Sequence, residues 1–140
     1  MTAGPEALAI AQVVVSAAED KLGRDILVLD VSEKLGIADV FVVVSGGNER
    51  QVGAIVDEVE RRCALAGFAS PVREGDREDP WVLLDFFDTV VHIQHVEART
   101  LYALDRLWKD CPVVDMRGAD GGFDTVASGD LLNHLDKGQS

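Results

Sequence analysis

Three groups of side chains in this sequence have the types that enzymes use for catalysis. The turn at 45–47 could belong to a phosphate-binding loop, Asp85 and Asp88 could hold a divalent metal ion, and His92 and His95 could be metal ligands. In each case the neighbouring residues decide whether that chemistry is feasible.

The turn at 45–47 reads Ser-Gly-Gly and precedes a helix start, and the N-terminus of a helix can bind anions. The chain lacks both Gly-x-x-x-x-Gly-Lys-Ser/Thr and Gly-x-Gly-x-x-Gly, and Glu49 would repel a phosphate. We therefore interpret the two glycines as residues that let a strand turn into a helix. Ser45 and His92 also lack the Gly-x-Ser-x-Gly context of a nucleophile elbow.

Asp85 and Asp88 point to opposite faces if they lie on one extended strand, and no third carboxylate has an obvious place beside them. We interpret Asp88 as a turn cap and Asp85 as a surface residue. On a strand His92 and His95 diverge for the same reason, and no cysteine lies nearby to complete a zinc site. His92 is then a hydrogen-bonded sheet residue or one presented to a partner. The sequence predicts no catalytic residue, no metal site and no cofactor.

The elements that position these residues follow from hydrophobic periodicity and turn residues. We expect helices over 8–21, 49–66 and 97–109, strands over 25–31, 40–44, 70–74, 81–86 and 89–93, and a loop over 35–38. Asn48 is expected to cap the second helix, with Gln51 close to a capping-box position, and Gly67 to end it. This order predicts an α/β sandwich around a mixed five-stranded sheet.

The strand over 81–86 has two different faces. One carries Val82, Leu84 and Phe86, and the other carries Trp81, Leu83 and Asp85. If helices cover only the first face, Trp81 and Leu83 point outward with a carboxylate at their edge, which is the usual anatomy of an interface hot spot. Spacing alone gives equal support to a core position for Trp81.

The last predicted helix has an inward stripe made of Leu101, Leu104 and Trp108, with Leu107 beside them. Tyr102 lies one helical step off this stripe and could join the surface around Trp81.

The chain has 140 residues and a formal net charge of −12, which predicts one acidic domain. An acidic surface disfavours wrapping by RNA or DNA and speeds diffusion toward a basic protein, although solubility alone explains the charge equally well.

No apolar run approaches the roughly 20 residues of a membrane span, and no basic signal segment begins the chain. We expect a cytoplasmic protein with a folded domain over 1–111 and a Gly/Asp-rich, largely disordered tail over 112–140.

Three blocks of the sequence, in this order, resemble the ribosomal silencing factor (Iojap-like) family: Ala38 to Val52, Trp81 to His92, and Arg99 to Trp108. The resemblance implies a nucleotidyltransferase-like fold without catalytic machinery. It also implies docking on the large ribosomal subunit, through the ribosomal protein numbered fourteen, at the face where the small subunit joins. Such docking would block subunit association and lower translation under nutrient limitation.

The resemblance further implies a homodimer and a set of partner-facing residues: Trp81, Leu83, Asp85, His92 and Tyr102. One departure is Phe87, which stands where the family usually has glycine. Phenylalanine does not easily take a positive φ, so we expect a differently shaped turn or a packed Phe87. Two alternatives stay open: a large-subunit assembly factor with the same dock, and a residual nucleotidyltransferase that uses Asp85 and Asp88 with magnesium.

Overall fold

The computed structural model describes residues 3–36, 38–77, 79–116 and 124–126. The helices are α1 (Pro5–Asp20), α2 (Ser32–Leu35), α3 (Glu49–Leu65), α4 (Val96–Tyr102) and α5 (Leu104–Leu107). The strands are β1 (Arg24–Asp30), β2 (Val40–Gly46), β3 (Val72–Glu74), β4 (Trp81–Asp85), β5 (Thr89–His95), β6 (Val113–Asp115) and β7 (Asp124–Val126).

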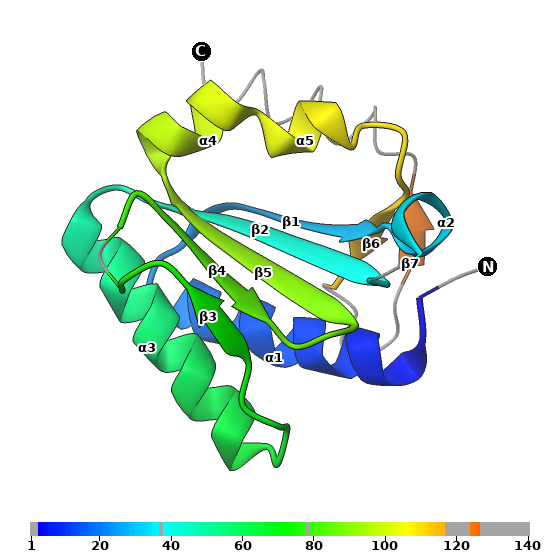
Figure 1. Ribbon diagram of the computed structural model, residues 1–140, viewed down its shortest axis with the longest axis horizontal. Coiled ribbons are helices and arrows are strands. Elements are labelled where there is room, and N and C mark those ends of the chain that lie inside the picture. Colours follow the sequence, from blue (N-terminus) through cyan, green and yellow to red (C-terminus); the bar gives the residue numbers. More distant parts are fainter. Residues whose placement is uncertain (1–2, 37, 78, 117–123, 127–140) are drawn as a thin grey trace.

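The described strands form one sheet in the order β3-β4-β5-β2-β1-β6-β7. The central pair β2–β5 is parallel and the other pairs are antiparallel. Helices α1 and α3 lie against one face, while α4 and α5 lie across the other (Figure 1). The predicted α/β class and mixed sheet are confirmed. The sheet contains β6 and β7 in addition to the five predicted strands.

The main core lies between the sheet and the α1–α3 layer. Because successive strand residues point to opposite faces, Val42 and Val44 of β2 and Val82 and Leu84 of β4 enter this core. Phe41 belongs instead to a smaller core on the other face, beside Leu29 and Val113, with Trp108 packed against it. Every residue of β2 is buried, as expected for a strand covered on both faces.

The start of α3 agrees with the predicted cap. The Asn48 side chain accepts a hydrogen bond of 2.8 Å from the Gln51 backbone N–H. The Gln51 side chain accepts from the N–H of Gly47 at 2.6 Å and donates to the carbonyls of Lys21 and Leu22. Gln51 therefore ties the beginning of α3 to the turn that follows α1.

The predicted continuous helix over 97–109 is wrong. The chain is helical in α4 and α5, but Ala103 between them has a left-handed backbone with φ of 49°. Leu104 after the break is buried, while Leu101 before the break and Leu107 after it are 76% and 67% exposed. The expected inward positions of Leu101 and Leu107 are therefore also wrong.

Two further segments differ from expectation. The predicted loop over 35–38 begins inside the short helix α2, which ends at Gly36 in a left-handed conformation. The prediction that a disordered tail begins at residue 112 is wrong at its start, because Val113 of β6 pairs with Leu29 of β1 and both Val113 and Val114 are buried. The rest of that tail, at 117–123 and 127–140, lies outside the described residues.

None of the helices in the described part of the chain combines the length and the apolar character that a membrane crossing requires.

Candidate protein-binding surface

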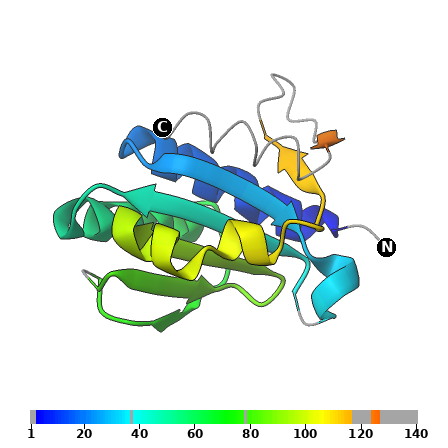
Figure 2. The ribbon, with the colours of Figure 1, turned by 90° about the horizontal axis from the view of Figure 1, so that it is seen from above.

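Strand β4 divides into a buried and a partly exposed face, as its sequence alternation predicts. Val82 and Leu84 are completely buried against the α1–α3 layer. Trp81, Leu83 and Asp85 on the opposite face are only partly buried. On this side α4 contacts β5 and β2, the strands next along the sheet (Figure 2).

Trp81 and Tyr102 come together at the edge of this face. Their ring centroids are 4.6 Å apart, with the ring planes inclined by 47°. The Tyr102 side chain is 52% exposed, whereas Trp81 is partly buried. Such an aromatic pair contributes about 0.5–1.5 kcal/mol beyond the area that it buries. The structure thus brings together the two predicted aromatic residues, and we call Trp81, Leu83, Asp85 and Tyr102 the docking surface.

His92 lies beneath this surface instead of on it. Only 5% of the residue is exposed, and the indole Nε1 of Trp81 donates a hydrogen bond of 3.2 Å to its Nδ1. The His92 ring also meets the edge of Phe41, with centroids 4.8 Å apart. Burial lowers the pKa of His92 to about 4, so the ring is neutral near pH 7. His92 is a hydrogen-bonded sheet histidine and does not reach the protein surface as a partner-facing residue would.

Asp85 shapes the turn between β4 and β5. Its Oδ1 accepts a hydrogen bond of 2.7 Å from the N–H of Phe87. The sequence predicted Asp88 as the residue that caps this turn, but the capping side chain is Asp85. Asp88 contributes its backbone carbonyl, which accepts from the N–H groups of Asp39 and Val40. Phe87 takes a positive φ of 74° although this was not expected of phenylalanine, and its side chain is 71% exposed, so the alternative of a packed Phe87 is also wrong.

Sequence reasoning missed three exposed apolar side chains close in the chain to this surface: Phe87, Leu101 and Leu107. Leu101 and Leu107 were assigned to the inward stripe because nothing in the sequence marks a break at Ala103. Phe87 carried a signal, because an aromatic residue at a turn position favouring glycine is unusual. A contiguous exposed apolar patch often marks a partner-binding surface, whereas single exposed apolar side chains are ordinary, so these three residues do not by themselves define such a surface.

The histidines and the Ser-Gly-Gly turn have structural roles. Nδ1 of His95 accepts a hydrogen bond from the N–H of Glu97 and caps α4, whereas Nδ1 of His92 accepts from Trp81. A Cβ added at Gly46 would lie 3.0 Å from the backbone nitrogen of Val52, so this glycine permits the close approach of β2 to α3. Among the described residues no group of three or more His, Cys, Asp or Glu side chains could hold a metal ion.

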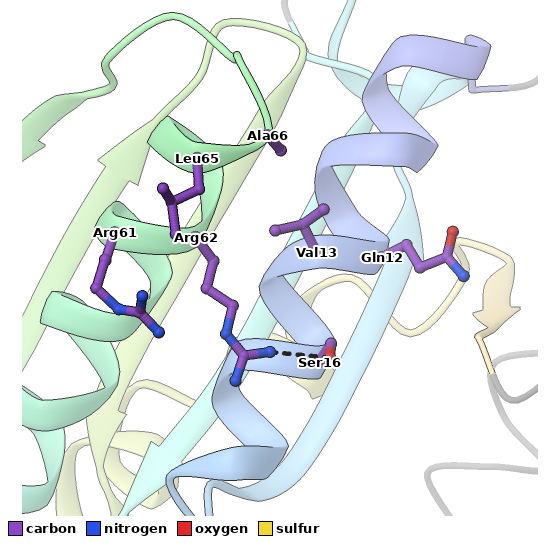
Figure 3. Close-up of a pocket in the computed structure, with 7 residues that line it drawn as sticks. All are labelled: Gln12, Val13, Ser16, Arg61, Arg62, Leu65 and Ala66. Carbon is purple, nitrogen blue, oxygen red and sulfur yellow. Dashed lines mark hydrogen bonds between the residues drawn. The ribbon is translucent and has the colours of Figure 1, made fainter.

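A shallow groove also lies between α1 and α3, on the far side of the sheet from the docking surface (Figure 3). Its lining residues are Gln12, Val13, Ser16, Arg61, Arg62, Leu65 and Ala66. Arg62 donates to Ser16 at 3.2 Å and pairs with Asp20 and Glu58. Arg61 pairs with Glu58 as well. Because carboxylates of the same helices already engage both guanidinium groups, the groove offers little free positive charge to an anion.

Comparison with known proteins adds an independent line of evidence. A family model described as "Ribosomal silencing factor during starvation" matches residues 4–130. The ribosomal silencing factor RsfS of Bacillus subtilis is 36% identical over 107 residues, which are 76% of this chain and 91% of that protein. A crystal structure of a Chromobacterium violaceum protein has a TM-score of 0.70 and 32% sequence identity, covering 73% of this chain and 85% of the other.

A more distant relative is the mitochondrial assembly of ribosomal large subunit protein 1 of Mus musculus. It is 30% identical over 100 residues, which are 68% of this chain and 43% of that protein.

The fold and these relatives place the chain in a class of regulatory, ribosome-associated factors that are not enzymes. The chain belongs to the ribosomal silencing factor (RsfS) family. The family match extends to residue 130, beyond the end of the blocks recognised in the sequence.

Proposed function

We propose that the protein is a translational repressor that binds the large ribosomal subunit and sterically blocks joining of the small subunit. The observation that carries this proposal is the Trp81–Tyr102 pair at the start of β4, on its partly exposed face. Leu83 and Asp85 lie on the same face of β4. A partly exposed aromatic pair, with an apolar and an acidic side chain further along the same strand face, is suited to a protein partner, and steric exclusion needs no catalytic group.

The partner that we propose is ribosomal protein fourteen of the large subunit, at the face where the small subunit joins. The net charge of −12 supports a basic partner, because opposite charges steer diffusional encounter. We also propose that the protein forms homodimers and acts in the cytoplasm, on ribosomes, when nutrients are scarce. The relatives named ribosomal silencing factor support the silencing role.

A subunit-joining measurement tests this proposal. Purified large subunits are incubated with the protein, small subunits are then added, and light scattering follows the formation of joined ribosomes. We expect fewer joined ribosomes as the protein concentration rises, and no effect when the protein is mixed first with small subunits alone and then removed. Undiminished joining at saturating protein would contradict a steric block.

A large-subunit assembly factor with the same dock is the second candidate. It is favoured by the printed name of the Mus musculus relative, which refers to assembly of the ribosomal large subunit. Depletion of the protein in growing cells separates the two functions. Immature large-subunit particles in a sucrose gradient would support assembly, whereas mature subunits with more joined ribosomes during starvation would support silencing. Because the family is not one of enzymes, we set the nucleotidyltransferase alternative aside.

A further inference from the structure

Trp81 is held from below by a residue of the neighbouring strand. Strands β4 and β5 are antiparallel, with Trp81 opposite Gln94 and Leu83 opposite His92. His92 is thus the diagonal neighbour of Trp81 on the same face, a position within reach of an aromatic side chain. The bond from Nε1 of Trp81 to Nδ1 of His92 measures 3.2 Å, and the ring centroids are 5.9 Å apart.

The direction of this hydrogen bond assigns the imidazole proton. An indole N–H can only donate, so Nδ1 of His92 accepts and the proton of the neutral ring lies on Nε2. Nε2 is buried and has no hydrogen-bond partner among the described residues. Within the described part of the chain, the hydrogen bond from Trp81 is therefore the polar contact that the His92 ring makes.

A purely structural role would not require a histidine at this position. The ring is 5% exposed and contacts the rings of both Phe41 and Trp81. An aliphatic side chain of similar size would fill much of the same space without leaving a buried N–H unpaired. The histidine is the less stable choice for packing, but it supplies an acceptor that an aliphatic side chain lacks.

We propose that His92 is a positioning residue of the docking surface: it fixes the orientation of the Trp81 indole, so that the Trp81–Tyr102 pair is presented to the basic partner protein. This role rests on the proposed function, in which Trp81 anchors the large subunit. His92 does not touch the partner. Without its acceptor the indole can change rotamer, and binding must first restore the ring to its place against Tyr102.

Two substitutions separate the acceptor from the packing. His92→Asn places an amide oxygen near the position of Nδ1 but fills less space, so it lowers the free energy of unfolding. His92→Leu fills the space without an acceptor: it removes the unpaired Nε2–H of the ring but leaves the partly exposed indole N–H of Trp81 to water, so we expect it to be more stable than His92→Asn. Of the two variants, we therefore expect His92→Leu to be the more stable and His92→Asn to bind the large subunit more tightly.

The experiment measures affinity for purified large subunits together with the indole N–H exchange rates of the full-length protein by NMR. The Trp108→Phe variant assigns the two tryptophan signals. For His92→Leu we expect faster exchange at Trp81 and binding weaker by about fivefold to tenfold. For His92→Asn we expect a protected Trp81 signal and binding within about threefold of the parent.

The outcomes also distinguish failure of this inference from failure of the docking surface. If Trp81→Ala weakens binding but His92→Leu binds as tightly as the parent, the positioning role is overturned and the surface stands. If both His92 variants weaken binding in proportion to their loss of stability, the role is structural and the inference fails. If Trp81→Ala itself binds as tightly as the parent, both the docking surface and this role of His92 are overturned.

Discussion

Arg99 of α4 donates a hydrogen bond of 3.0 Å from Nη1 to the Oγ of Ser45 at the end of β2, and both residues are buried. This contact joins the helix that carries Tyr102 to the centre of the sheet. It therefore positions one half of the Trp81–Tyr102 pair, while His92 contacts the other half.

Removing the Ser45 hydroxyl tests how strongly this contact stabilises the fold. We expect Ser45→Ala to lower the free energy of unfolding by about 1.5–3 kcal/mol, because hydrogen bonds to charged groups in buried sites are worth about that much. Urea denaturation measures the change. Thr100→Ala is the matched control, since its hydroxyl is exposed on the same helix and should matter by less than about 0.5 kcal/mol. Equal effects of the two substitutions would show that the Arg99 contact is not stabilising.

Gln94 is the buried side chain with the poorest hydrogen bonding in the described residues. It has no exposed surface, and neither its amide nitrogen nor its amide oxygen has a partner there. Replacing an unsatisfied buried amide with an apolar side chain of similar length should be stabilising. We expect Gln94→Met to raise the free energy of unfolding by about 1 kcal/mol.

Gln51→Met provides the control for this prediction, because the Gln51 side chain makes hydrogen bonds to Gly47, Lys21 and Leu22. We expect it to lower the free energy of unfolding by about 1–3 kcal/mol. If Gln94→Met destabilised the protein as much as Gln51→Met, the Gln94 amide would have to be hydrogen-bonded in the folded protein.

The turn at Phe87 predicts a stabilising substitution. Phe87 has a positive φ and a largely exposed side chain, so little packing opposes its replacement. Phe87→Gly should raise the free energy of unfolding by about 0.5–1 kcal/mol, since relief of backbone strain exceeds the entropy cost of glycine. Leu22, with φ of 60° and 77% exposure, offers an independent repeat of the same test. A loss of stability in both glycine variants would refute the strain argument.

Burial of His92 predicts that stability depends on pH in the acidic range. Its pKa is about 4 in the folded protein, against an ordinary value of 6.5, so only the unfolded chain takes up this proton between those two pH values. The free energy of unfolding should therefore fall as pH drops below 6.5, by about 3 kcal/mol at pH 4 from this residue. Urea denaturation of the parent and of His92→Leu isolates the effect. A constant difference between them from pH 7 to pH 4 would contradict it.

The features that could be predicted from the sequence are those set by local pattern. The alternation along β4 placed Trp81 and Leu83 on the open face, and the Asn48 cap marked the start of α3. The break at Ala103 could not be predicted, because alanine favours a continuous helix and the left-handed conformation depends on how α4 and α5 pack on the sheet. Strand β6 was missed because three residues form a strand only when other strands pair with them, here β1 and β7.

The candidate site shows the same division between local and long-range information. Its members on β4 followed from the period of two, whereas the burial of His92 under Trp81 depends on the cross-strand register. Asp85 caps the N–H of Phe87, and Phe87 itself has a left-handed backbone that its residue type argues against.

The most direct test of the central claim is the affinity of Trp81→Ala for purified large ribosomal subunits, measured by co-sedimentation over a range of protein concentrations. Leu65→Ala serves as the control, because Leu65 is 74% exposed on α3, in the groove on the opposite side of the sheet. We expect Trp81→Ala to bind at least about 30-fold more weakly, as for an interface hot spot, and Leu65→Ala to bind like the parent. Unchanged binding by a folded Trp81→Ala protein would contradict the account.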